Sequence, residues 1–414
     1  MRPEVELLLC CANATTDTSR AERVRTLLHT DLDWAFLLQT AGRQGVLPLL
    51  SRSLHAIVPD EVPQRILVQL RHHSQANAAR NLFLTDELLK LLTLLESHGI
   101  PALPYKGPAL TALIYGNLAL RDFADLDLLV HERDYERVQC LLSTSGYRLM
   151  KAFENESTYV DGSGTVAVDL HKRMTSREFP SPLQFEHLWE RRRHTVLLGR
   201  KVLTLSPEDT LLMLAIQISK DAGTRYLQLV KICDVAALLR AFPSLNLPQA
   251  LHDARQGGGE RMVLLSLSLA HDLLGAQLPH EIVAQIRTEP VIGHLVDSVR
   301  QQFFEDCGSN IVDHRSNNRF RWLVRERLQD KLHPYYQRYV HNVLVPCSLD
   351  QQLVPLPEPL AFLHYGIRPI RLLCKYGSLL VRGRLGGIAS WPMSAKLGAF
   401  PKRITPNGPG PKKS

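Results

Sequence analysis

Apolar residues in the first hundred positions recur at three- and four-residue spacings, the period of an α-helix. We expect helices over LDWAFLLQTAGRQGVLPLL and over the run from about Val62 to Ser97. Within that run, Asp86 is expected to cap a helix covering ELLKLLTLLESHG, and Gly99 to end it. The pattern therefore predicts an N-terminal helical region over residues 1–99.

Residues 100–205 change to short apolar segments of strand length. Two of the expected strands are Ile100–Lys106 and Leu126–His131, and each is followed by a helical pattern. Hairpins at Gly162-Ser163-Gly164 and at Gly199-Arg200 supply later strands. This pattern predicts a mixed α/β unit built around one sheet of about five to seven strands.

From Ser206 the helical period returns, and it continues to about Val345. The first of these helices opens with the capping pattern Ser206-x-x-Asp209. The last part of the chain is rich in proline, then in glycine and basic residues, which favours a linker and a disordered tail. The predicted fold class is α+β, a mixed β-sheet domain flanked by helical regions. Its predicted parts are a helical region 1–99, an α/β domain 100–205, a helical domain 206–345, a Pro-rich linker with a short C-terminal segment 346–376, and a basic disordered tail 377–414.

Charge is unevenly distributed along the 414 residues. The formal net charge is +8, and eight Lys and Arg with no acidic residue lie between Lys375 and the C-terminus. The remainder is therefore close to neutral, which argues against nucleic acid as a partner. No apolar run approaches the ~20 residues of a membrane span. The seven cysteines show no C-x-x-C spacing, so we expect a reducing, cytoplasmic compartment.

The tripeptide Asp-Leu-Asp occurs twice, at Asp31–Asp33 and at Asp125–Asp127. The first copy precedes a helical pattern, where carboxylates cap free backbone N–H groups and oppose the helix dipole. The second copy enters a predicted strand, in which alternation directs both carboxylates to one face. Because two adjacent carboxylates repel each other unless a cation lies between them, and Mg²⁺ prefers oxygen ligands, the second copy is the candidate metal site.

A third acidic residue lies on a later predicted strand. VAVDLH places Asp169 between apolar neighbours, with His171 on the same face. A carboxylate in such a strand is costly to bury without a partner, and a metal ion would supply one. The alternative is that all three acids lie at strand ends and reach water.

A glycine turn precedes the candidate metal site. Tyr105-Lys106-Gly107-Pro108 joins a predicted strand to a helix that begins at Pro108. Glycine there lets backbone N–H groups approach a phosphate, and the helix N-terminus favours its negative charge. Such a turn alone is common between strands and helices. With three carboxylates downstream, it predicts a phosphate site facing a metal site.

Together these motifs resemble the polymerase β-like nucleotidyltransferase superfamily, in which a small-residue turn precedes an Asp-x-Asp strand and a third carboxylate follows on a later strand. The chain resembles more closely the family of uncharacterised nucleotidyltransferases. The residues that carry this resemblance are Lys106-Gly107, Tyr115, Arg121, Asp125-Leu126-Asp127, Gly146-Tyr147 and Asp169-Leu170-His171. The resemblance extends into the helical flanks, including Ser206–Asp209 and Arg368-Pro369, over about residues 5–376.

Two departures from the resemblance concern the substrates. The superfamily has a second small residue where this chain has Lys106, so its phosphate contacts must differ in detail. Many relatives carry a histidine in the helix that begins after Ser206, whereas AIQISKDAG has none. Lys220 and Asp221 are the candidates for that substrate-side role.

The resemblance implies Mg²⁺-dependent transfer of a nucleoside monophosphate from a nucleoside triphosphate to a hydroxyl group. It implies two Mg²⁺ ions, with Mn²⁺ as the alternative. The implied catalytic and metal-binding residues are Asp125, Asp127 and Asp169. Asp169 would also help to deprotonate the acceptor.

Five further residues have implied roles at the substrates. The candidate nucleotide-binding residues are Lys106, Gly107 and Arg121. For Arg121 the alternative is a structural ion pair with Asp122 or Asp125. The candidate acceptor-side residues are His171 and Asp234, and for both a structural role in the core is the alternative.

The acceptor is expected in a cleft between the sheet and the helices that follow it. A small hydroxylated molecule or a protein hydroxyl fits the near-neutral charge of this part of the chain. The competing function is a catalytically silent scaffold that binds nucleotide or a partner protein, although a scaffold has no need of three acids in strands. A metal-dependent glycosyltransferase would explain the Asp-x-Asp dyad but neither Asp169 nor the Lys-Gly turn.

Overall fold

The computed structural model describes residues 1–12, 18–175, 183–224, 226–304, 314–336, 340, 342–346, 350, 354 and 356–382. The contacts divide the chain into two units, Met1–Pro334 and Tyr335–Ser414. Within the described residues, no helix is both long and apolar enough to cross a membrane. The fold class is α+β, as predicted, while the five predicted domain ranges stay a prediction.

Helices form the N-terminal part of the first unit, as the apolar periodicity predicted. They are α1 (Pro3–Ala12), α2 (Thr18–Leu28), α3 (Trp34–Arg43), α4 (Leu47–Ile57) and α5 (Gln64–Ser97). Asp33, in the first Asp-Leu-Asp copy, is the N-cap of α3, and its carboxylate accepts a hydrogen bond of 2.9 Å from the Phe36 N–H. The interpretation of this copy as the start of a helix is therefore confirmed for Asp33.

Helix α5 is one continuous helix of 34 residues, so the prediction of a new helix capped by Asp86 is wrong. The segment contains neither glycine nor proline to interrupt it. Asp86 instead lies on the solvent side and pairs with Lys90 one turn later, at 2.9 Å. The predicted end is correct, because Gly99 follows the last turn with a φ of +66°.

A five-stranded mixed sheet follows. Its strands are β1 (Ala102–Pro104), β2 (Asp125–Val130), β3 (Arg148–Ala152), β4 (Glu156–Val160) and β5 (Ala167–His171). They are ordered β1-β2-β5-β4-β3, with β2 and β5 parallel and the other pairs antiparallel. This order places the two strands that carry the predicted acids side by side.

The last two predicted strands, β6 (Arg193–Leu197) and β7 (Arg200–Thr204), form a separate two-stranded sheet, so the prediction of one sheet is wrong. Strand β1 is short, and Pro101 and Pro104 remove two of the backbone N–H donors that another strand would need. Strand β7 contacts β1 through a side chain instead, because the Thr204 hydroxyl donates to the Pro104 carbonyl at 2.7 Å.

The two faces of the five-stranded sheet differ. One face buries Leu126, Leu128, Val168 and Leu170 against the C-terminal half of α5 and against α7 (Tyr135–Thr144). Alternation directs the residues between them to the other face, which carries the acids. The remaining elements of this part are α6 (Gly107–Tyr115), η1 (Leu118–Leu120), η2 (Glu132–Asp134) and α8 (Phe185–Arg191).

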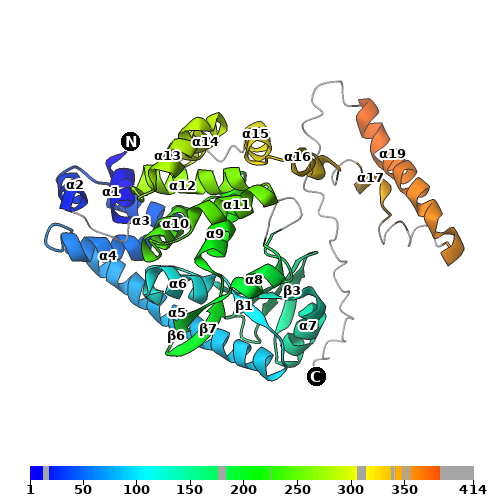
Figure 1. The fold of residues 1–414 in the computed structure, drawn as a ribbon, viewed down its shortest axis with the longest axis horizontal. Coiled ribbons are helices and arrows are strands. Elements are labelled where there is room, and N and C mark those ends of the chain that lie inside the picture. The colour runs from blue at the N-terminus through cyan, green and yellow to red at the C-terminus, as the bar shows by residue number, and fades with distance from the viewer. Residues whose placement is uncertain are drawn as a thin grey trace, which may run out of the picture. The chain divides into compact units, whose positions relative to one another are not determined.

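The helices before and after the sheet share one apolar core, in which Leu7 of α1 and Leu265 of α12 are both fully buried. Figure 1 shows the blue N-terminal helices beside the green ones. The later helices of this unit are α9 (Pro207–Ala222), α10 (Leu229–Ala241), α11 (Leu247–Gly257), α12 (Glu260–Leu274), α13 (His280–Thr288), α14 (Pro290–Phe304), α15 (His314–Val324) and α16 (Leu328–Tyr335). The helices that precede the sheet in the sequence therefore pack directly against those that follow it.

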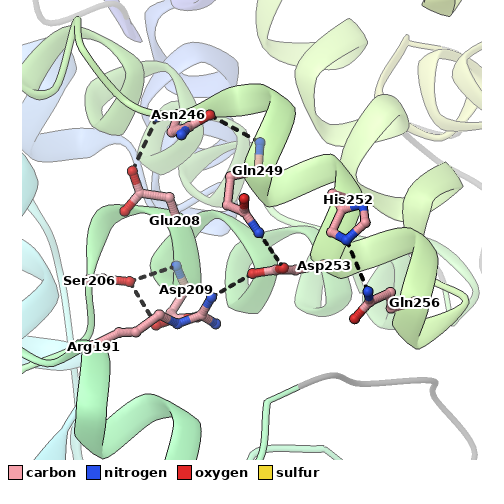
Figure 2. Close-up of polar contacts among 9 residues, drawn as sticks. All are labelled: Arg191, Ser206, Glu208, Asp209, Asn246, Gln249, His252, Asp253 and Gln256. Carbon is pink, nitrogen blue, oxygen red and sulfur yellow. Dashed lines mark hydrogen bonds and ion pairs between the residues drawn. The ribbon is translucent and has the colours of Figure 1, made fainter.

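The start of α9 is fixed by a network of polar contacts (Figure 2). The predicted cap is confirmed, because the Ser206 hydroxyl accepts from the Asp209 N–H at 3.1 Å and donates to its carboxylate at 2.6 Å. Arg191 of α8 bridges this fully buried carboxylate and Asp253 of α11. These contacts join α8 and α11 to the N-terminus of α9.

The second unit contains α17 (Asn342–Leu344), η4 (Glu358–Leu363) and α19 (His364–Arg382). Its fully buried Asp350 accepts from Arg368 at 2.7 Å and from Arg371 at 2.6 Å. Helix α19 covers the predicted C-terminal segment and extends past Tyr376 into the stretch predicted to be disordered. The rest of that stretch, residues 383–414, lies outside the described residues.

Candidate active site

The turn between β1 and α6 requires glycine. Gly107 has a φ of +51°, and a Cβ added to it would lie 3.1 Å from the Asp125 carbonyl oxygen. Lys106 is the N-cap of α6 and makes no side-chain capping bond to the helix. The N–H groups of the first turn are therefore left without a side-chain cap, beside the start of β2.

Strands β2 and β5 bring the predicted acids together on one face. Asp127 is the direct cross-strand partner of Asp169, and Asp125 and His171 lie two residues along their strands on the same face. Asp127 is 4 % exposed and His171 5 % exposed. The alternative that the acids simply reach water at strand ends is therefore wrong for Asp127.

Asp127 is held by two side chains. Lys106 Nζ lies 2.7 Å from Asp127 Oδ1, and His171 Nε2 lies 3.0 Å from the same oxygen. Burial by itself would raise the pKa of Asp127, but the charge of Lys106 and the His171 contact hold it below its ordinary value. Burial and the charge of Asp127 raise the pKa of Asp125. This face of the sheet therefore carries several carboxylates, and the Lys106 ammonium group lies against one of them.

The donor set fits a divalent cation. Ligand atoms of Asp127, Asp169 and His171 lie within 4.8 Å of one another. Asp169 Oδ1 is buried and has no hydrogen-bond partner, which is costly unless a cation binds it. Two carboxylates with one imidazole suit Mn²⁺ as well as Mg²⁺. Asp125 shares the face but is not in this group of three.

Arg121 has a different partner from those considered in the sequence. Its Nε lies 3.0 Å from Oδ2 and 3.1 Å from Oδ1 of Asp234 on α10, rather than pairing with Asp122 or Asp125. Asp234 is fully buried and also accepts from the Tyr115 hydroxyl at 3.0 Å. Arg121 lines the cleft described next, and its side chain is 12 % exposed. Asp234 therefore contacts Arg121 rather than the cleft.

A cleft of about 720 Å³ opens over the acidic face. Lys106, Gly107, Asp125, Asp127 and His171 line its sheet side. The opposite walls come from the turn between α3 and α4, the middle of α5, the end of α9 and the start of α10, and they include both residues proposed for the missing histidine, Lys220 and Asp221. The catalytic and binding roles of all these residues stay predictions.

The sequence analysis did not identify the buried polar residues of α5, which are Asn77, Asn81 and Thr85. Asn81 donates from its amide to the Leu118 and Arg121 carbonyls, at 2.7 and 2.8 Å, and Asn77 donates to the Ala119 carbonyl at 3.2 Å. These bonds hold the backbone of Arg121 from one side while Asp234 holds its side chain. The signal was available, because Asn77, Asn81 and Thr85 recur at four-residue spacing within a buried face of the helix.

Comparison with known proteins supports one family. A family model described as "Uncharacterised nucleotidyltransferase" matches residues 30–275, which is more than half of the chain. No curated protein matches.

The solved structures that match this chain are distant. Two are structures of the antibiotic-resistance factor ANT(2'')-Ia, in solution (TM-score 0.32, 14 % identity, 42 % of this chain and 89 % of that one) and in complex with adenylyl-2''-tobramycin (0.31, 15 %, 42 % and 95 %). Another is an antigenic nucleotidyltransferase-like protein from Paracoccidioides brasiliensis (0.27, 18 %, 50 % and 96 %). These likenesses are too distant to transfer a substrate or a residue role. On the family match, the chain belongs to the uncharacterised nucleotidyltransferases.

Proposed function

We propose that the protein transfers a nucleoside monophosphate from a nucleoside triphosphate to a hydroxyl group of a small molecule or a protein, in a reaction that depends on Mg²⁺. The observation that carries this proposal is the register of Asp127 and Asp169, with an unpartnered carboxylate oxygen on Asp169. Beside them lies the uncapped N-terminus of α6, at the floor of a cleft large enough for a nucleotide.

The triphosphate would bind along the start of α6. Backbone N–H groups after Gly107 meet phosphate oxygens there, and the helix dipole favours their charge. Arg121 would add charge from the other side. Because its Nε is bound to Asp234, the guanidinium is held in one orientation before any ligand arrives.

Asp125, Asp127 and Asp169 would hold the metal, which when bound neutralises phosphate charge and stabilises the attacking and leaving oxygens. The acceptor oxygen forms a bond to the α-phosphorus as the bond to the bridging oxygen breaks, and pyrophosphate leaves. Asp169, whose carboxylate has no hydrogen-bond partner at Oδ1, would also help to take the proton of the acceptor hydroxyl. His171 orients Asp127 through their contact.

Replacing Gly107 by alanine is expected to weaken nucleotide binding and to lower the free energy of unfolding by about 1–2 kcal/mol. The new Cβ would press on the Asp125 carbonyl and shift α6 away from the acidic strand. Gly116→Ala is the matched control, because Gly116 also has a positive φ, of +65°, but open space around its Cβ position. Calorimetric titration with a non-hydrolysable triphosphate, combined with urea unfolding, separates the two effects. Equal loss of nucleotide affinity in both variants would contradict the assignment.

The competing function is a scaffold that binds nucleotide without turnover, and the ion pair of Lys106 with Asp127 favours it because the acids are already partly neutralised. Calorimetry with and without Mg²⁺, followed by measurement of pyrophosphate release in the presence of a cell extract, distinguishes the two. We expect Mg²⁺-dependent binding together with release. Mg²⁺-dependent binding without release from any extract fraction would support the scaffold.

A further inference from the structure

Lys106 is bound to the carboxylate that belongs to the proposed metal site. Its Nζ lies 2.7 Å from Asp127 Oδ1, and Asp127 is one of the three residues whose ligand atoms lie within 4.8 Å of one another. The Lys106 side chain is 25 % exposed and lines the cleft, so it has both a buried partner and an open path. A lysine in this place was expected to meet phosphate, and here it meets the acid instead.

An ammonium group and a divalent cation compete for this carboxylate. Like charges a few ångströms apart in a half-buried site repel strongly, because little water screens them. Lys106 also precedes Gly107 directly, so its flexible side chain starts at the helix N-terminus that would bind the triphosphate. Two partners for its charge therefore lie within reach of one backbone position.

We propose that Lys106 is an internal counter-ion that occupies Asp127 in the free protein and moves to the triphosphate when the metal arrives with the nucleotide. This inference rests on the proposed function, because it assumes that metal and nucleotide share the cleft. Its consequence is a binding order. The metal alone binds weakly, since it must displace Lys106 without giving it a new partner, and the metal–nucleotide complex binds well because it supplies one.

One substitution tests this binding order, because it is expected to change the affinity for the metal alone and the affinity for the metal–nucleotide complex in opposite directions. In Lys106→Met, the affinity for Mn²⁺ without nucleotide is expected to rise about tenfold, while the affinity for a non-hydrolysable Mg²⁺–triphosphate falls by a similar factor. Mn²⁺ binding is read by electron paramagnetic resonance of the free ion, and the nucleotide complex by calorimetry. A lysine that only stabilises the fold would move both affinities in the same direction.

The matched control is Lys220→Met, which removes a positive charge from another cleft wall, where no described carboxylate pairs with it. It is expected to leave the Mn²⁺ affinity unchanged. Unchanged or weaker Mn²⁺ binding in Lys106→Met, or equal tightening in Lys220→Met, overturns the proposal. Lys106→Gln repeats the test if the methionine variant is unfolded by circular dichroism. Mn²⁺ binding is measured without turnover, so the two proposals can fail separately. If Lys106→Met binds Mn²⁺ more tightly as expected but the wild type transfers no nucleotide, the proposed function is rejected and this inference stands.

Discussion

Replacing Asp169 by asparagine is expected to slow nucleotide transfer by about a thousandfold, within the 10²–10⁴-fold range of general base catalysis. Asparagine keeps the shape of the side chain but removes the charge that would bind the metal and accept the proton. The strand should tolerate the change, because Asp169 Oδ1 has no hydrogen-bond partner to lose. The fold and the rate are therefore expected to respond differently.

The rate is measured as pyrophosphate release with saturating nucleotide, and the fold by thermal unfolding. Asp60→Asn, at an exposed position between α4 and α5, serves as the control and should leave the rate unchanged. A tenfold loss of rate corresponds to an increase of only about 1.4 kcal/mol in the activation free energy. If Asp169→Asn retains more than about a tenth of the wild-type rate, Asp169 is neither base nor metal ligand.

Asp234→Ala is expected to lower the free energy of unfolding by about 3–5 kcal/mol, the usual effect of removing one partner from a buried ion pair. The substitution leaves the Arg121 guanidinium, 12 % exposed, without its carboxylate. It also removes the acceptor of the Tyr115 hydroxyl. Urea unfolding of the full chain measures the loss, with Asp86→Ala, which breaks an exposed pair on α5, as a control expected to show little change.

The double variant Arg121→Met with Asp234→Leu separates stability from function. Because no charge is left buried, most of the lost stability should return. Nucleotide affinity should stay low, because the guanidinium is gone. A double variant that binds nucleotide as well as wild type would show that Arg121 has only a structural role.

The local features of the site could be predicted from the sequence. Strand alternation has a period of two, so it places Asp125 and Asp127 on one face whatever the rest of the chain does. The Lys106-Gly107 turn was also predictable, since a glycine between a strand and a proline-initiated helix indicates a tight turn, and the structure gives Gly107 a φ of +51°.

The pairing of charges could not be predicted, because it depends on packing between distant segments. Arg121 and Asp234 lie 113 residues apart, and they meet only because α10 packs beside α6. Lys106 was predicted to bind phosphate, and the position of β2 beside the turn places Asp127 Oδ1 2.7 Å from its Nζ instead. The error at Asp86 has the opposite origin, since a local capping signal was overridden by the continuous buried face of α5.

The most direct test of the central claim uses nucleoside triphosphates labelled at the α-phosphate. Wild-type protein and the variant Asp125→Asn with Asp127→Asn are incubated with Mg²⁺ and with small-molecule and protein fractions of a cell extract. We predict that the wild type moves label to an acceptor with release of one pyrophosphate each time, that a chelator abolishes this, and that the variant does neither. Equal labelling by both proteins, or no binding of nucleotide by either, would contradict the account.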